Sequence, residues 1–367
     1  MNYIKELEKI YSYPLPQYFE DFLSKEIILY GGGSLGFMGS QLLLEAGYNV
    51  KYIVDKFSSG GEVNGIKIIS PENIPEIDKK QALFLICIAT ISYNEISAYL
   101  KSIGIENMMQ YYTFAFIKFP ELLSNGWTLY KPNEQEKSEI ENVCKALNHD
   151  ETSITHYLQF LWWKLRGVEK IYSPVLSGKK YFKSPIFPKL NRNEILLDGG
   201  AHFGQTIEGF VNITHNKFER IYAFEPDAKN LQICKDKFTD NRIIYSDKAI
   251  YSSNKKVKFA EGLGYASKID INGKTTKDAV TIDSLNINPT IIKLHTESDE
   301  LEGLLGAVNT IKRSTPIIMV MADHSIDGLY KIPKFIYSLP EYKLYFNLND
   351  YCGNTAVFFG IPKIREK

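Results

Sequence analysis

The feature that most constrains this chain is a glycine-rich turn in its second half. Residues Leu196–Gly204 read LLDGGAHFG, and Phe224-Glu225-Pro226 follow at the end of the next apolar run. This order is typical of a strand–loop–helix–strand unit. Glycines let a backbone approach a ligand where a side chain would collide, and the acid can accept both hydroxyl hydrogens of a ribose. The turn therefore predicts a nucleoside site.

Length and charge exclude several classes of protein. At 367 residues with 44% hydrophobic content, the chain is long enough for about two domains with their own cores. Its 43 Lys and Arg balance its 43 Asp and Glu, so no excess charge favours nucleic acid or an anionic membrane. The longest apolar stretch, Ala82–Ala89, is far below the ~20 residues of a spanning helix. We expect no nucleic-acid partner and no membrane insertion.

The cysteines and the overall composition indicate a cellular compartment. The four cysteines are scattered without a CxxC pair, which favours buried thiols in a reducing cytosol over disulfides or a zinc site. Abundant Tyr, Phe, Ile, Lys and Asn are typical of AT-rich bacterial genes. We expect a bacterial, cytoplasmic protein.

The first half predicts a small Rossmann-like domain at 26–112, after a helical lead-in at 1–25 that is interrupted at Pro14–Pro16. Strands are expected at Glu26–Tyr30, Asn49–Val54, Ile66–Ile69 and Leu83–Ile88, and helices at Leu35–Ala46 and Glu95–Ile103.

This domain carries a second glycine motif, Gly31, Gly33 and Gly36, with Asp55 ending the next strand. One interpretation is a nucleotide or sugar-nucleotide site with Asp55 on a ribose. The other is that the glycines only permit a tight turn and close helix–strand packing. The segment after Asp55 resembles N-terminal domains of sugar-modifying transferases, which points to nucleotide-sugar or glycan chemistry.

Residues 113–190 are predicted to be a helical connecting region. Helices are expected at Glu134–Leu147 and Thr152–Leu165, the second capped by Thr152 or Ser153. Trp162 and Trp163 lie at helical spacing, so we assign them to the core rather than to a site. The loop at 177–183 either closes over a ligand or is simply solvated.

The last part, 191–367, predicts a doubly wound sheet with an antiparallel terminal hairpin. Its final two strands have no helix between them, as at the end of class I methyltransferases. The whole chain is thus expected to be an α/β protein of two Rossmann-like domains. Strands are expected at Ile195–Leu197, Arg220–Phe224, Ile243–Tyr245, Ile291–Leu294, Pro316–Met321, Lys343–Phe346 and Thr355–Gly360, with a hairpin near Lys256–Phe259.

The motifs of this part resemble, in order and spacing, the FkbM family of S-adenosylmethionine-dependent methyltransferases, over roughly residues 150–362. The matching segments are Asp198–Gly204, Ala223–Asp227 with Asn230, Lys248–Ile250, Ile282–Leu285 and Ile292–Ala307. The resemblance implies transfer of a methyl group from S-adenosylmethionine, commonly to an oxygen of a sugar, polyketide or other small metabolite.

The same motifs supply the candidate cofactor-binding residues. The glycine turn is expected beneath the methionine part of the cofactor, Glu225 on the ribose and the end of the third strand beside the adenine. The candidates are Asp198, Gly199, Gly200, Ala201, His202, Gly204, Glu225, Pro226, Asp247, Lys248 and Ala249.

The chain departs from the family pattern after the fourth strand. Where the family usually reads DVEGAE, residues His295–Glu300 read HTESDE. Methylation of an alcohol is helped by a general base, and His295, Glu297 and His324 are the candidates, because they follow predicted parallel strands. A metal site of these residues with Asp323 is conceivable, but their spacing matches no recognised zinc or iron motif. We expect no metal.

These observations favour a methyltransferase that acts on an oxygen of a sugar, glycan or nucleotide-linked sugar. Two alternatives stay open. The altered segment at His295 would also fit a binding or scaffold protein of a surface-glycan pathway, and the first glycine motif would fit an NAD-dependent sugar-modifying enzyme. The expected partner is a small-molecule or glycan acceptor, and the chain could form a homo-oligomer.

Overall fold

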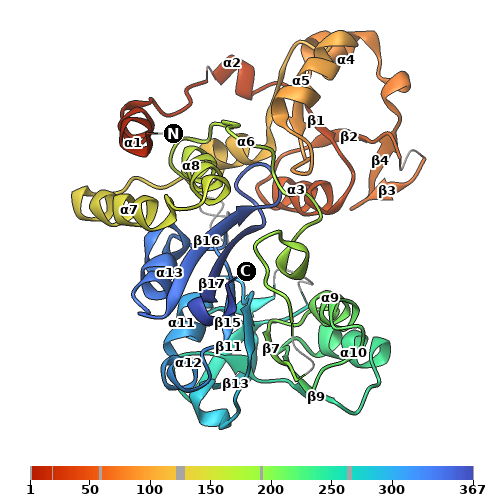
Figure 1. Ribbon diagram of the computed structural model, residues 1–367. Helices are drawn as coiled ribbons and strands as arrows, with labels where there is room; N and C mark the ends of the chain where they lie inside the picture. Colours follow the sequence, from red (N-terminus) through yellow and green to blue (C-terminus); the bar gives the residue numbers. More distant parts are fainter. Residues whose placement is uncertain are drawn as a thin grey trace.

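The computed structural model describes residues 2–18, 20–57, 60–120, 129–190, 193–262 and 267–366. It is a mixed α/β structure dominated by parallel strands. Figure 1 shows the N-terminal sheet in the upper right, the C-terminal sheet below it, and α1, α7 and α8 at the upper left. Within the described residues, no helix is both long enough and apolar enough to cross a membrane.

The N-terminal sheet has the order β3-β4-β2-β1-β5-β6, parallel except for β3. Its central strands are buried on both faces, as their continuous apolar runs predict. The strands are β1 (Ile27–Tyr30), β2 (Val50–Val54), β3 (Glu62–Val63), β4 (Ile66–Ile69), β5 (Leu83–Ile86) and β6 (Met108–Gln110). The helices are α3 (Ser34–Glu45), α4 (Glu76–Gln81), α5 (Tyr93–Ser102) and α6 (Tyr111–Lys118), after α1 (Tyr3–Ser12) and α2 (Glu20–Leu23).

Two helices in the middle of the chain pack on the C-terminal sheet. Helix α7 (Glu134–Leu147) starts with a capping box of Asn133 and Glu136, and α8 (Glu151–Arg166) packs on β16 (Tyr342–Leu348). The predicted cap of α8 at Thr152 or Ser153 is wrong. The helix starts at Glu151, and the Asp150 carboxylate before it accepts a hydrogen bond from the Ser153 amide, one of the unpaired donors of the first turn.

The C-terminal sheet has the order β16-β17-β15-β14-β7-β8-β9. Strand β17 runs antiparallel to both of its neighbours, and the remaining pairs are parallel. The further strands are β7 (Ile195–Gly199), β8 (Arg220–Phe224), β9 (Ile243–Ser246), β14 (Ile291–Leu294), β15 (Ile317–Met321) and β17 (Ala356–Pro362). The helices are α9 (Gln205–Ile213), α10 (Ala228–Lys237), α11 (Glu300–Leu305), α12 (Val308–Ser314) and α13 (Asp327–Tyr337).

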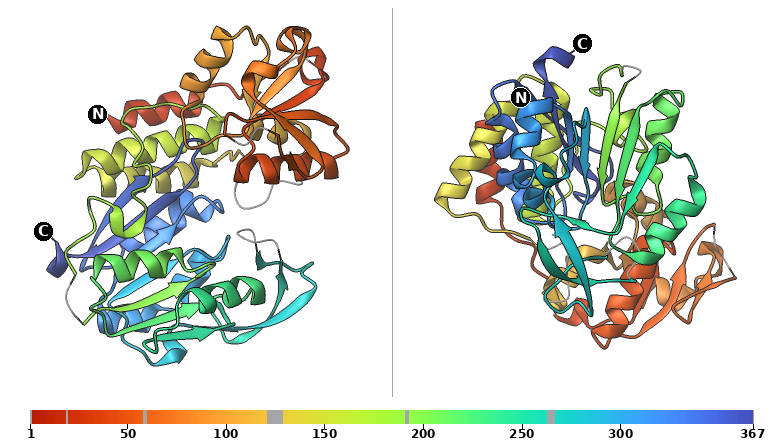
Figure 2. Two further views of the ribbon diagram at one scale, coloured as in Figure 1. Left: turned by 90° about the vertical axis from the view of Figure 1, so that its right-hand side faces the viewer. Right: turned by 90° about the horizontal axis from the view of Figure 1, so that it is seen from below.

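A small second sheet lies between β9 and β14 in the chain, with the order β10-β13-β11-β12. Its strands are β10 (Ala249–Ile250), β11 (Lys255–Ala260), β12 (Lys268–Ile269) and β13 (Thr275–Val280). The expected hairpin near Lys256–Phe259 is the β11 part of this sheet. Figure 2 shows these strands projecting beside the main sheet.

Alternate side chains of the C-terminal sheet enter two different cores. Leu197 faces α7, α8 and α13, whereas Leu196 faces α9 and α10. Trp162 and Trp163 are buried in cores, as expected, and Trp163 packs with residues of the N-terminal sheet. The four cysteines are free and buried.

Candidate functional site

A pocket opens at the carboxyl ends of β7, β8 and β14, where ligands bind in sheets of this kind. Six of the expected cofactor residues line it: Gly200, His202, Glu225, Pro226, Lys248 and Ala249. The other lining residues are Phe224, Ile250, Phe259, Ser267, Ile269, His295 and Thr296. Asp198, Gly199, Ala201, Gly204 and Asp247 are not in its lining, and Asp247 is exposed.

Glu225 is held in place by the backbone of the two loops that flank the pocket. Its Oε2 accepts a hydrogen bond from the His202 amide at 2.8 Å, and its Oε1 accepts one from the Asp227 amide at 2.9 Å. Burial raises the pKa of Glu225 to about 7, although these two hydrogen bonds act to lower it. The carboxylate is therefore fixed in orientation at the edge of the pocket.

Asp198 acts from beneath the glycine turn. Its carboxylate lies 2.8 Å from the ammonium of Lys293, and both side chains are almost completely inaccessible to solvent. Lys293 also donates to the carbonyl oxygens of Gly199 and Gly200. Gly200 has a φ of +77°, and a Cβ there would lie 1.9 Å from the His295 carbonyl oxygen. The turn thus requires glycine at this position.

The three candidate catalytic residues lie together, as the parallel order of β14 and β15 predicts. His295 Nε2 lies 3.1 Å from Glu297 Oε1, and His324 Nε2 lies 3.3 Å from the same oxygen. The rings of His295 and His324 are stacked with centroids 4.9 Å apart. His202 joins this group, because its ring centroid is 5.2 Å from that of His295. The sequence assigned His202 only to the cofactor.

The neighbouring charges give the two stacked histidines different protonation states. Burial lowers the pKa of His324, but the carboxylates of Glu297 and Glu300 outweigh it and raise the pKa to about 9. Burial and the nearby cation of Lys180 keep the pKa of His295 well below its ordinary value. At neutral pH His324 is a cation and His295 is neutral. Burial raises the pKa of Glu297 to about 7.

Sequence reasoning missed Tyr181. Its hydroxyl lies 3.1 Å from His295 Nδ1, and the residue is buried with a φ of +52°. Tyr181 belongs to the loop that follows Leu176, so part of the segment expected either to close over a ligand or to be solvated does reach the histidines. Residues 177–179 of this loop are exposed. No periodic pattern marks Tyr181, and only the tertiary fold brings it to His295.

The glycine motif of the N-terminal sheet is closed by its own aspartate. Asp55 accepts hydrogen bonds from the amides of Gly32, at 2.7 Å, and Phe57, at 2.8 Å. A Cβ on Gly36 would lie 2.1 Å from the Gly31 carbonyl oxygen, so Gly36 is needed for close helix–strand packing, while Gly33 faces open space. These contacts fit the packing interpretation of the motif.

Comparison with known proteins gives an extensive likeness to a solved structure. No family model matches the sequence, and no curated protein matches it. The crystal structure of the methyltransferase FkbM from Methylobacillus flagellatus KT is similar over 98% of this chain and 98% of that one, with a TM-score of 0.72 at 17% identity. The two chains share one fold. The likeness includes the N-terminal sheet, since it spans nearly the whole of both chains.

Other solved structures are similar over about half of the chain. Aeropyrum pernix fibrillarin with bound S-adenosyl-L-methionine is 12% identical, covering 47% of this chain and 68% of that one with a TM-score of 0.30. A putative methyltransferase of Streptococcus mutans in complex with SAH is 13% identical, covering 47% and 90% with a TM-score of 0.29. Scores this low do not establish a common fold.

Proposed function

We propose that the chain is an S-adenosylmethionine-dependent methyltransferase that acts on an oxygen of a sugar, glycan or nucleotide-linked sugar. The observation that carries the proposal is Glu225, which two backbone amides hold at the edge of the pocket beside the glycine turn. A fixed acid at the end of the second strand is suited to accept two ribose hydroxyls.

The pocket has the chemistry that this cofactor needs. Phe224, Ile250 and Ile269 supply apolar walls for an adenine, and Glu225 lies among them. The Thr296 hydroxyl is buried in the lining and has no hydrogen-bond partner among the described residues, so a polar ligand atom would satisfy it. The residues that would hold the cofactor are Gly200, His202, Glu225, Pro226, Lys248, Ala249 and Thr296.

The remaining chemistry is assigned to the histidine group. The cofactor supplies an electrophilic methyl group on a sulfonium. The chain positions the acceptor oxygen in line with it and removes the hydroxyl proton, and positioning supplies much of the rate. Neutral His295 lines the pocket, while Glu297 has a pKa of about 7 and is suited to take a proton at neutral pH.

The acceptor class rests on the resemblance of the segment after Asp55 to N-terminal domains of sugar-modifying transferases. In this proposal the N-terminal unit recognises the acceptor. An NAD-dependent activity is separated from this proposal by calorimetry with NAD, which the proposed methyltransferase is expected not to bind.

Calorimetric titration with S-adenosylmethionine tests the first step. Wild type is expected to bind it, and Glu225→Ala to lose at least about tenfold in affinity, since each charge-assisted hydrogen bond contributes about 1.5–3 kcal/mol. Glu219→Ala is the matched control, because Glu219 is an exposed acid at the opposite end of β8, outside the pocket lining. Absence of binding by wild type, or equal loss in both variants, contradicts the proposal.

Transfer is tested separately with labelled donor and a panel of sugars and sugar nucleotides. Wild type is expected to methylate at least one acceptor and His295→Ala to do so much more slowly. Undiminished transfer by His295→Ala would exclude the proposed role of this residue. Cofactor binding without transfer to any acceptor would favour the scaffold alternative.

A further inference from the structure

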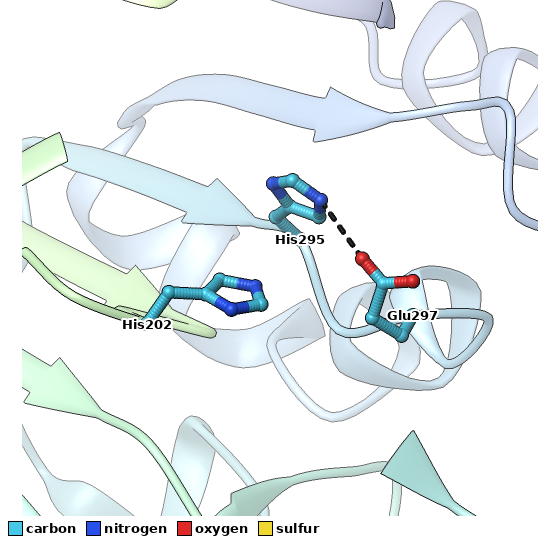
Figure 3. Close-up of side chains that lie close together, drawn as sticks. All are labelled: His202, His295 and Glu297. Atoms are coloured by element: carbon cyan, nitrogen blue, oxygen red, sulfur yellow. Dashed lines mark ion pairs between the residues drawn. The ribbon is translucent and has the colours of Figure 1, made fainter. Parts of the chain in front are cut away.

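Three of the six histidines in the chain gather with two acids at one edge of the C-terminal sheet. His202 comes from the glycine turn after β7, and His295 and Glu297 come from the loop after β14. One ligand atom from each of these three side chains lies within 4.8 Å of the other two. Figure 3 shows the two rings and the carboxylate surrounding a common space.

The distance between His295 and Glu297 matches that between neighbouring ligands of one metal ion. Donor atoms about 2.0–2.2 Å from an ion, at tetrahedral or octahedral angles, are separated by about 3.0–3.5 Å. His295 Nε2 and Glu297 Oε1 are 3.1 Å apart. The ligand atom of His202 lies within 4.8 Å of both, near enough for the three side chains to face one ion.

Tyr181 orients His295 as a ligand. Histidines that bind metals almost always make a second hydrogen bond through their other ring nitrogen, which fixes the tautomer. His295 Nδ1 lies 3.1 Å from the Tyr181 hydroxyl, on the opposite side of the ring from Glu297. With the proton on Nδ1 and donated to Tyr181, the lone pair of Nε2 points toward Glu297.

The candidate ligands are shielded from solvent. His202 and Glu297 are both 6% exposed, and the side chain of His295 is 14% exposed. His324 instead pairs with Glu300, at 2.8 Å, and lies beside the trio rather than in it.

We propose that His202, His295 and Glu297 bind a first-row divalent transition-metal ion, whose open positions take oxygen atoms of the acceptor. Two imidazoles and one carboxylate suit Fe²⁺, Co²⁺, Mn²⁺ or Zn²⁺ and leave coordination sites free. In the ion-bound protein His295 and Glu297 are ligands rather than bases, and a bound hydroxyl loses its proton to solvent more readily, because the ion stabilises the oxyanion. Binding of the ion is independent of the proposed function, whereas coordination of the acceptor rests on it. The ion also departs from the sequence-based expectation of no metal.

The test is titration of chelator-treated protein with Co²⁺, followed by visible absorption, and with Zn²⁺, followed by calorimetry, in the absence of donor and acceptor. Wild type is expected to bind one equivalent of either ion. His202→Asn, which tolerates the left-handed backbone at this position, and Glu297→Gln should each lose at least about tenfold in affinity. His149→Ala is the matched control, since His149 is an exposed histidine on a different part of the chain.

Two results would overturn the proposed ion site: no stoichiometric binding by wild type, or binding by both variants as tight as that of the control. Thermal melting in the presence of chelator verifies that each variant is folded. Tyr181→Phe provides a second measurement, because it should weaken Co²⁺ binding about tenfold or more without abolishing it. Unchanged Co²⁺ affinity in Tyr181→Phe contradicts the assigned orientation of His295.

Coordination of the acceptor by the ion is measured separately. If an acceptor is found, its addition should change the absorption of bound Co²⁺, and chelation should slow transfer until the ion is restored. An unchanged spectrum at saturating acceptor would show that the ion does not coordinate the acceptor. Ion binding without methyl transfer to any acceptor would refute the proposed function while leaving the ion site intact.

Discussion

Asp198 and Lys293 form a buried ion pair across adjacent parallel strands, with the carboxylate and the ammonium 2.8 Å apart at the carboxyl ends of β7 and β14. Lys293 also donates to two carbonyl oxygens of the glycine turn. The pair therefore links the turn to the strand that carries His295. Its role in the site is structural, because it holds the glycine turn against the end of β14.

Removal of the cation should destabilise the protein strongly. Lys293→Met leaves the buried Asp198 carboxyl without its ion-pair partner, and we expect a loss of about 3–5 kcal/mol in the free energy of unfolding, measured with urea. The double variant Asp198→Asn, Lys293→Met should recover most of this loss. Lys256→Met, at the exposed pair with Asp278, should cost less than about 1 kcal/mol. Equal losses at the two lysines would contradict this account.

The glycine turn should reject even a methyl group at Gly200. Gly200→Ala combines a left-handed backbone with a close approach to the His295 carbonyl oxygen, whereas Gly178 is left-handed in open space. The alanine variant at Gly178 should lose about 1–2 kcal/mol from backbone strain alone. Gly200→Ala should lose about 1–3 kcal/mol more and bind the cofactor more weakly. Urea unfolding of both variants measures the difference, and similar losses would argue against the backbone contact.

Much of the fold and part of the site follow from the sequence because they depend on local patterns. The apolar runs ending at Asp198 and Phe224 define two parallel strands, and the carboxyl ends of such strands meet at one edge. His295 and His324 follow two further parallel strands, β14 and β15, and lie together for the same reason. Glu225 was predicted in the same way, because it directly follows the second run, and it lines the pocket.

The remainder depends on contacts between segments that are far apart in the chain. Tyr181 precedes His295 by 114 positions and lies in a loop without periodicity. The small sheet of β10 to β13 includes strands of two residues and exposed charged positions, so its pattern is too short to read. The cap of α8 was misplaced because Asp150 and Ser153 are both favourable capping residues.

The stability of the protein should depend on pH through Glu169, a partly buried residue beside the start of α5. Burial raises its pKa to about 7, and it accepts a hydrogen bond from the Tyr93 amide at the start of α5. Because the folded pKa lies above the ordinary value of 4.5, its contribution to stability is full below about pH 4.5 and is lost as the pH rises through about 7. Glu169→Gln should melt with a smaller decrease over this range than wild type. Parallel melting curves would show that Glu169 is not the group responsible.

The last prediction concerns Asp55, whose two hydrogen bonds close the first glycine turn. If the motif serves packing, Asp55→Ala should lower the free energy of unfolding by about 1–3 kcal/mol, because two backbone amides lose a charged acceptor. Asp55→Asn should restore part of this, since its amide oxygen can accept one of the bonds. The affinity for S-adenosylmethionine should stay within about twofold of wild type in both variants, because Asp55 lies in the other sheet.

The opposite outcome distinguishes a nucleotide site. A ribose-binding Asp55 would give an Asp55→Ala variant of near-normal stability that loses binding of a sugar nucleotide detected in wild type. Urea unfolding and calorimetry with a sugar nucleotide and with NAD, applied to the same three proteins, separate the two cases. A stable Asp55→Ala variant with lost nucleotide binding would reject the packing role. It would show that the Gly32 and Phe57 amides can lose their acceptor without a decrease in the free energy of unfolding.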